Sequence, residues 1–153
     1  HGMKDRNNAN HFGYVSRMDN LQAAILNYRL HKLDKIIEAR RKNAESYIDG
    51  LDSVEIRTPE EEKHEFNSYH TFAIQVEKRN ELKNFLSKQG IETAIHYPTP
   101  IHLQPAAEDL GYKLGDFPVT EKQAEVILTL PVNQSLNRGD ISRIISAANE
   151  FYS

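Results

Sequence analysis

The chain has 153 residues, of which 39% are hydrophobic and 27% are charged, with 19 Lys and Arg against 22 Asp and Glu. This length and composition are typical of one globular domain that can bury a core without disulfide or metal cross-links. The net charge of −3 argues against nucleic acid as the main partner. Because cysteine is absent, disulfides, thiolate zinc sites and cysteine nucleophiles are excluded. The chain is compatible with a cytoplasmic location, and no apolar run approaches the ~18 residues of a membrane span.

A long amphipathic helix is the first strong signal along the chain. Apolar residues recur every three or four positions over residues 19–51, which predicts a helix of roughly 45 Å. Asp19 and Gln22 resemble a capping pair at its start, and Gly50 stands where a left-handed C-terminal cap would fall. The basic cluster 40–42 on this helix is interpreted as a solvated face. A helix of this length is typical of a connection between two domains or subunits.

Shorter elements follow, and together they predict an α/β fold in which helices pack on one face of a small sheet. Alternating, β-branched and aromatic residues predict the strand at 69–76, and prolines close several of the predicted strands. The predicted strands cover residues 54–56, 69–76, 91–97 and 128–132. Helices are predicted around Leu82, Phe85 and Leu86 up to Gly90, from a Thr120 and Gln123 capping pair, and from a cap near Asn137 to Phe151.

Two segments carry side chains that suit ligand binding. Residues 95–104 lie at the end of a predicted strand, where His96 and Tyr97 can donate and accept hydrogen bonds and prolines fix their direction. Residues 13–19 place Arg17 just before a helix N-terminus, and both features suit anions. The alternatives stay open for both segments: a buried turn with packed aromatic rings for the first, and an ordinary capped helix with a surface arginine for the second.

The histidines do not predict a metal site. The seven histidines include no pair at the i, i+4 spacing of a helical zinc site. His96 and His102 flank a proline-rich loop without an adjacent carboxylate that would complete a ligand set. We therefore expect no metal.

Four segments in register resemble the nucleotide-sugar aminotransferases of the DegT/DnrJ/StrS group. They are Gly-Tyr-Val-Ser-Arg-Met-Asp-Asn-Leu-Gln-Ala-Ala-Ile-Leu at 13–26, residues 90–104 with His-Tyr-Pro-Thr-Pro-Ile-His-Leu-Gln, Gly-Asp-Phe-Pro-Val-Thr-Glu at 115–121, and Leu-Thr-Leu-Pro-Val at 128–132. The resemblance implies the C-terminal part of a fold-type I enzyme that depends on pyridoxal 5'-phosphate. Residues 1–18, an irregular lead-in, would end the large domain, residues 19–51 would form the connecting helix, and residues 52–153 would form the small α/β domain.

The resemblance also implies a reaction. Such enzymes carry pyridoxal phosphate on a lysine and move an amino group from glutamate to a keto sugar nucleotide by a ping-pong mechanism. They are homodimers with a site shared across subunits, and the products enter polysaccharide and other glycan pathways. The carrier lysine lies upstream in the family, in a serine-containing motif that this sequence lacks. This chain alone is therefore expected to be inactive and to supply the wall of the site.

Arg17, Ser16 and Val15 would face the cofactor in this resemblance. Arg17 matches an arginine that reaches the neighbouring subunit's site, near the phosphate and the anionic groups of the sugar nucleotide. Val15 departs from the pattern, because family members commonly carry an asparagine there that bonds the phosphate. Valine cannot donate that bond, so a backbone amide or Ser16 would replace it, or phosphate affinity would be lower.

His96, Tyr97 and His102 would face the sugar, together with Arg17. His96 and Tyr97 match a pair that contacts the sugar in members that act at the 3-keto position. The sequence His-Tyr-Pro-Thr-Pro-Ile-His, which ends at His102, resembles that 3-keto branch more than the 4-keto branch.

Two alternatives belong to other functional classes. The absent lysine motif and the valine at position 15 also fit a non-catalytic ligand-binding or regulatory module on the same scaffold. An unrelated small α/β interaction domain is the other alternative, and four ordered segments of family resemblance disfavour it.

Overall fold

The computed structural model describes residues 14 and 17–153, which fall into two compact units, His1–Lys35 and Ile36–Ser153. In the first unit, the described part contains helix α1, Asn20–Leu30. Asp19 precedes it, and its backbone N–H donates to Oε1 of Gln22 at 3.1 Å, as the predicted capping pair requires. No residue of α1 is buried.

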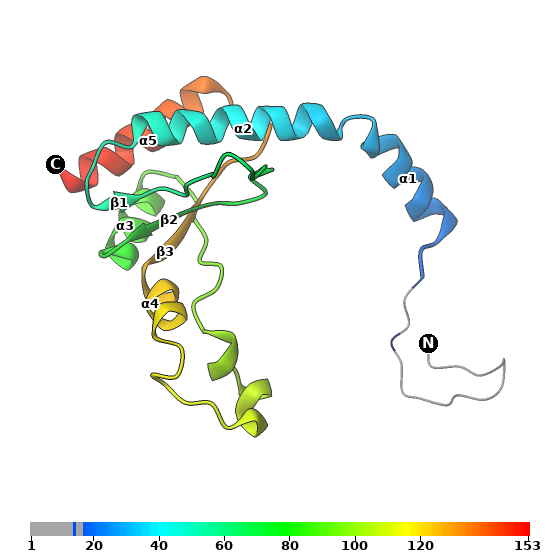
Figure 1. Cartoon of the computed structure of the whole chain (residues 1–153). Coiled ribbons are helices and arrows are strands. Elements are labelled where there is room, and N and C mark those ends of the chain that lie inside the picture. The colour runs from blue at the N-terminus through cyan, green and yellow to red at the C-terminus, as the bar shows by residue number, and fades with distance from the viewer. Residues whose placement is uncertain (1–13, 15–16) are drawn as a thin grey trace, which may run out of the picture. The chain divides into compact units, whose positions relative to one another are not determined.

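The second unit contains the remaining helices and the sheet (Figure 1). The helices are α2 (Leu33–Gly50, which begins just before the unit), α3 (Arg79–Lys88), α4 (Pro118–Val126) and α5 (Arg138–Tyr152), with two 3₁₀ helices, η1 (Ile101–Leu103) and η2 (Pro105–Leu110). The strands are β1 (Ile56–Arg57), β2 (Phe72–Val76) and β3 (Ile127–Leu130). The strand order is β1-β2-β3 and both pairings are antiparallel, so the predicted α/β fold with a small sheet is confirmed.

The core lies on one face of this sheet. The pairing of Phe72 with Leu130 and of Ile74 with Leu128 puts these side chains on the same face, because strand residues alternate between faces. Buried residues of α2, α3 and α5 pack against them. At the centre, the rings of Tyr47 and Phe72 lie 4.9 Å apart. The full set of buried core residues is Ala44, Tyr47, Leu51, Ile56, Tyr69, Phe72, Ile74, Val76, Leu82, Leu86, Ile91, Leu128, Leu130, Val132, Ile141, Ile144, Ala147 and Ala148.

The helix predicted over residues 19–51 is two helices. A turn at His31 and Lys32 separates α1 from α2, and the N–H of Lys32 donates to the carbonyl of Arg29, three residues back, at 2.9 Å. Apolar spacing reports which side chains share a face, and it continues across this turn. Periodicity therefore could not detect that the backbone ladder is interrupted.

Gly50 is the last residue of α2 and does not adopt the predicted left-handed conformation. Packing against α5 explains the glycine at this position instead. A Cβ at this position would lie 2.9 Å from Cδ1 of Ile145, so the absence of a side chain permits the close approach of α2 and α5. The side-chain amide of Asn149 donates to the Gly50 carbonyl at 2.9 Å and closes this contact.

The strand predicted over residues 91–97 is reduced to a single bridge. Ala94 and Thr129 exchange two backbone hydrogen bonds, of 2.7 and 3.1 Å, while the residues around Ala94 form no strand. The N–H of Ile91 is already used by the carbonyl of Leu86 at the end of α3. Pro98 has no N–H to donate, which limits any ladder on the other side.

The predicted start of α5 is confirmed, and the predicted start of α4 is wrong. α5 begins after Asn137 as predicted, with Asn137 Oδ1 accepting from the N–H of Asp140 and the Asp140 carboxylate accepting from the N–H of Asn137, both at 3.0 Å. α4 begins at Pro118 and not from a Thr120 cap. Proline has no N–H and a fixed φ, so it fits the first helical position and moves the start forward.

The basic cluster at 40–42 is only partly the solvated face that was predicted. Arg40 donates from Nη1 to the carbonyls of Tyr69 and His70, at 3.2 and 2.8 Å. Arg41 reaches the carboxylate of Glu61. Sequence spacing places both on α2 but does not reveal that the chain before β2 folds back over them.

Tyr47 provides a test of the core. Its ring is fully buried, and its hydroxyl donates to the Pro131 carbonyl at 2.7 Å. Burial raises the pKa of this hydroxyl, so it stays protonated and remains a donor. Tyr47→Phe is expected to lower the free energy of unfolding by about 1 kcal/mol, measured by urea titration. The matched control is Tyr112→Phe, whose ring is half exposed; equal losses in the two variants would contradict the account.

Candidate functional site

His96 is held at the edge of the sheet by Thr129. The Nδ1 of His96 lies 3.0 Å from Oγ1 of Thr129, a residue of β3 that is only 8% exposed. The ring of Tyr97 meets the His96 ring edge-on at 5.5 Å, and Tyr97 itself is 74% exposed. The structure therefore brings together the two residues that were predicted to contact the sugar, and it leaves Tyr97 open to solvent.

A hollow of about 170 Å³ lies beside this pair. The polar groups around it are an imidazole, hydroxyls and the amide of Gln123, and α4 forms its opposite side. The rest of the lining is mainly apolar, and an apolar hollow with a few groups that can donate and accept hydrogen bonds is typical of a site for a small molecule. Its lining residues are His96, Tyr97, Thr99, Pro100, Ile101, Thr120, Gln123, Ala124 and Ile127.

His102 faces a carboxylate. Its Nε2 lies 2.8 Å from Oε1 of Glu121, and the two side chains are 7% and 13% exposed. Both oxygens of Glu121 also accept the N–H of Gly115 at 2.9 Å, and Oε1 accepts the N–H of Phe117 at 3.4 Å. Burial alone would raise the pKa of Glu121, but the Gly115 amide, His102 and the Phe117 amide hold it below its ordinary value.

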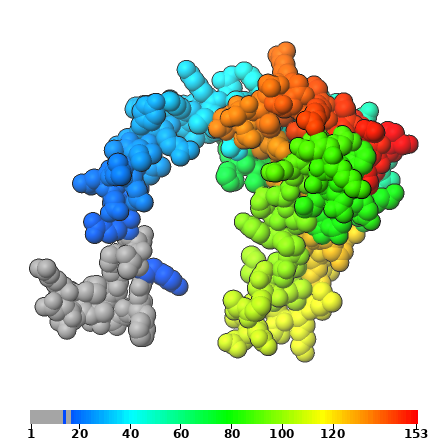
Figure 2. Space-filling model, turned by 180° about the vertical axis from the view of Figure 1, so that it is seen from behind, coloured from blue at the N-terminus to red at the C-terminus, as the bar shows by residue number. Residues whose placement is uncertain are grey.

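This pair anchors the long loop that carries η1 and η2. Figure 2 shows the loop, in yellow-green and yellow, extending from the body of the second unit. The His102 ring also packs on Phe117 at 4.8 Å, and Phe117 packs on Tyr112 at 5.1 Å. Glu121 thus ties both ends of the loop to the start of α4.

Arg17 stands in the first unit, just before α1. Its side chain is 74% exposed, and it pairs with Asp19, with Nε 3.6 Å from Oδ1. Together with Met18, Gln22, Ile25 and Leu26 it lines a hollow of about 380 Å³. A guanidinium with this freedom can pair with an anion. Val15 and Ser16, the other residues predicted near the cofactor, lie outside the described residues.

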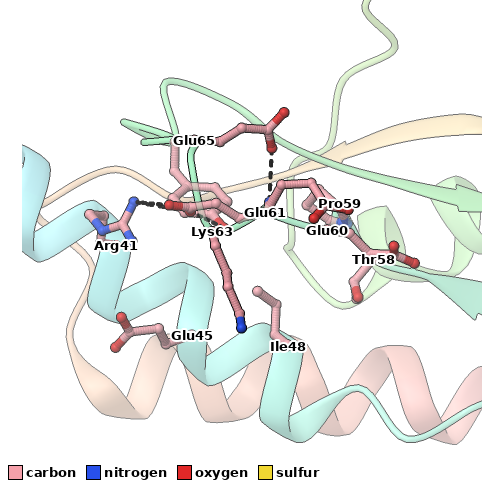
Figure 3. A pocket seen from close by; sticks show the side chains of 11 residues that line it. Arg41, Glu45, Ile48, Thr58, Pro59, Glu60, Glu61, Lys63 and Glu65 are labelled. Carbon is pink, nitrogen blue, oxygen red and sulfur yellow. Dashed lines mark hydrogen bonds and ion pairs between the residues drawn. The ribbon is translucent and has the colours of Figure 1, made fainter.

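A third hollow, of about 650 Å³, lies between α2 and residues 58–65 (Figure 3). Across it, Nη1 of Arg41 bonds both oxygens of Glu61 at 3.0 and 3.1 Å and the carbonyl of Asn67 at 2.7 Å. The hydroxyl of Tyr69 donates to Glu61 at 3.2 Å. Burial would raise the pKa of Glu61, but hydrogen bonds from Arg41 and the Asn67 backbone lower it. These contacts fasten the loop to α2.

None of the lysines in the described part of the chain is buried. The pKa of Lys42 is raised by Glu38, and that of Lys122 is raised by Glu77. A lysine that carries a cofactor as a Schiff base must lose its proton, which burial promotes and a carboxylate partner opposes. The described residues thus provide an arginine for an anion but no lysine suited to that role.

Comparison with known proteins identifies the family. The family profile of the DegT/DnrJ/EryC1/StrS aminotransferases matches residues 1–149. The chain belongs to this family. Its members depend on pyridoxal 5'-phosphate, and no described lysine is suited to carry that cofactor as a Schiff base, whereas the exposed guanidinium of Arg17 has the charge to pair with a phosphate.

Individual relatives agree with this assignment. The "pleiotropic regulatory protein" of Geobacillus stearothermophilus is 39% identical over 99% of this chain and 42% of its own length. The UDP-2-acetamido-2-deoxy-3-oxo-D-glucuronate aminotransferase of Pseudomonas aeruginosa is 36% identical, over 97% of this chain and 40% of its own. The crystal structure of Streptomyces venezuelae DesV with a ketimine intermediate has a TM-score of 0.89 at 34% identity, over 98% of this chain and 41% of DesV. The chain therefore spans about two fifths of the length of these relatives.

Sequence reasoning missed Thr129 and Gln123 as members of the site. A signal for Thr129 was present, because Leu128 and Leu130 are apolar and their period of two places Thr129 on the opposite face of the sheet. Gln123 was interpreted only as part of a capping pair. Among the described helices, none is long and apolar enough to cross a bilayer.

The Glu121 anchor predicts a pH dependence. A carboxylate whose folded pKa is depressed stabilises the fold above its ordinary pKa, and this contribution disappears as the pH falls through the folded value. Glu121→Gln is therefore expected to lower the melting temperature at pH 7 and to differ less from the parent at pH 4. Glu125→Gln, an exposed carboxylate on the same helix, is the control. A deficit that is the same at both pH values would contradict this role.

Proposed function

We propose that the protein containing this chain is a pyridoxal phosphate-dependent aminotransferase that moves an amino group from glutamate to a keto sugar linked to a nucleotide, by a ping-pong mechanism. Family membership supports the reaction class. The observation that supports the sugar assignment is the hollow beside His96 and Tyr97, a mainly apolar surface into which an imidazole, hydroxyls and the Gln123 amide bring hydrogen-bonding groups. The relative that acts on a 3-oxo sugar supports a 3-keto substrate.

In this proposal the chain is the C-terminal part of the enzyme. Residues 1–18 end the large domain, residues 19–51 connect, and residues 52–153 form the small domain. The enzyme is a homodimer with a site shared across subunits. It works in the cytoplasm, where its amino sugars feed polysaccharide synthesis.

The residues of this chain would have distinct tasks. Pyridoxal phosphate, when bound, supplies the electron sink for moving a proton at the amino-bearing carbon. Arg17 would hold an anionic group of the cofactor or the nucleotide across the dimer, with Ser16 or the backbone at Val15 assisting. His96 and Tyr97 would bond the hydroxyls of the sugar.

His102 takes a supporting task in this proposal. Its ring is covered and its Nε2 is bonded to Glu121, so it would fix the loop that leads away from His96. A covered ring that already has a partner has little to offer a sugar directly.

The function is tested on the complete protein purified with pyridoxal phosphate. Incubation with glutamate and a set of UDP- and dTDP-linked 3-keto and 4-keto sugars should produce 2-oxoglutarate and the amino sugar, with a change in the visible absorption of the bound cofactor. A protein that binds no pyridoxal phosphate would contradict the proposal and would favour a regulatory module. Turnover of 4-keto sugars alone would overturn the 3-keto preference.

Arg17→Ala in the complete protein is expected to raise the KM for the sugar nucleotide, or the Kd for the cofactor, by about 10- to 100-fold, the usual effect of losing a charge-assisted hydrogen bond. Arg29→Ala is the matched control, because Arg29 is an exposed arginine in the last turn of α1, the helix that Arg17 precedes. If both constants remain at the parent value, Arg17 is not part of the site.

A further inference from the structure

Thr129 is the only residue of the described part of β3 that is polar, and it is buried. Its register partner on β2 is Ala73, which offers no hydrogen-bonding side chain. The hydroxyl of Thr129 instead meets Nδ1 of His96 at 3.0 Å. We propose that Thr129 is a positioning residue that fixes the ring of His96 and thereby decides which ring nitrogen is presented to the substrate. This inference rests on the proposed function of His96.

Three contacts with Thr129 fix the chain around His96. The carbonyl of Thr129 accepts the N–H of Ala94 at 3.1 Å, and its N–H donates to the carbonyl of Ala94 at 2.7 Å. The hydroxyl contact with His96 is the third. One strand residue therefore holds both the backbone and the functional side chain of this segment. Because β3 is paired with β2 through four residues, Thr129 is itself rigidly placed.

The contact with Thr129 determines which ring nitrogen of His96 is left for a ligand. The Thr129 hydroxyl can donate to Nδ1 or accept from it, and in either case Nδ1 is occupied and Nε2 is the ring nitrogen left for another partner. Among the described residues, none forms a hydrogen bond with Nε2 of His96. The ring also borders the hollow that Gln123 and Thr120 line from α4. Nε2 is thus the nitrogen available to a sugar hydroxyl, with its orientation set by Thr129.

The test compares Thr129→Val with Thr129→Ser in the complete protein. Valine has nearly the shape of threonine and a high strand propensity but no hydroxyl, whereas serine keeps the hydroxyl. With ¹⁵N-labelled histidine, the Nδ1 resonance of His96, assigned by its loss in His96→Ala, should shift in Thr129→Val and return in Thr129→Ser. Thr129→Ala provides a second hydroxyl deletion if the valine variant does not fold.

The kcat/KM values of the Thr129 variants should change in parallel with the Nδ1 resonance. Thr129→Val is expected to lower kcat/KM for the sugar nucleotide by about 3- to 10-fold, the range for one neutral hydrogen bond, and Thr129→Ser should restore it. In a His96→Ala background, Thr129→Val should cause no further loss, because a residue that acts through His96 has nothing left to position.

The outcomes separate this inference from the proposed function. An Nδ1 resonance that stays in place in Thr129→Val and Thr129→Ala would overturn the inference, as would additive kinetic losses in the double variant. A second outcome is that the Nδ1 resonance shifts in Thr129→Val while His96→Ala leaves kcat/KM unchanged. That outcome would overturn the proposed contact between His96 and the sugar, and Thr129 would then have no role in positioning the substrate. It would leave the hydrogen bond between Thr129 and His96 as an established contact.

Discussion

The antiparallel pairing of β2 with β3 is the constraint on which both the core and the candidate site depend. Its register puts Phe72 opposite Leu130 and Ala73 opposite Thr129. Since side chains alternate between faces, the first pair enters the core and the second lies on the other face. A slip of one residue would turn Thr129 inward and remove the residue that holds Ala94 and His96. The packing of the core therefore also secures the geometry of the site.

Two loops are fastened to this body by a similar device. In each, a carboxylate accepts hydrogen bonds from a basic side chain and from the backbone: Glu61 from Arg41 and the Asn67 amide, and Glu121 from His102 and the Gly115 amide. The pKa of both carboxyls is lowered, because these donors outweigh the cost of burial. The Glu121 anchor holds the loop that follows His96, so it contributes to the site without facing the ligand.

Features that depend on hydrophobic periodicity, helix capping or short sequence motifs could be predicted from the sequence. The alternation in β2, the strand at β3, the Asn137 cap of α5 and the family resemblance were all found from the sequence. The turn at His31 was not, because the apolar stripe continues through it. The sequence did not predict three long-range contacts, because only the folded chain brings their partners together. These contacts join Arg40 to Tyr69, Arg41 to Glu61, and Thr129 to His96.

In the proposed function, the hollow beside His96 and Tyr97 is where the sugar binds. The proposed transfer of an amino group to a sugar requires an oriented sugar ring, and hydrogen-bonding groups that are held by a rigid strand, as His96 is held by Thr129, can orient it. The most direct measurement is a crystal structure of the complete protein with pyridoxamine phosphate and a nucleotide-linked 3-keto sugar. The account predicts that a sugar hydroxyl lies within hydrogen-bond distance of Nε2 of His96 while Nδ1 stays on Thr129. A sugar bound out of reach of both His96 and Tyr97 would contradict it.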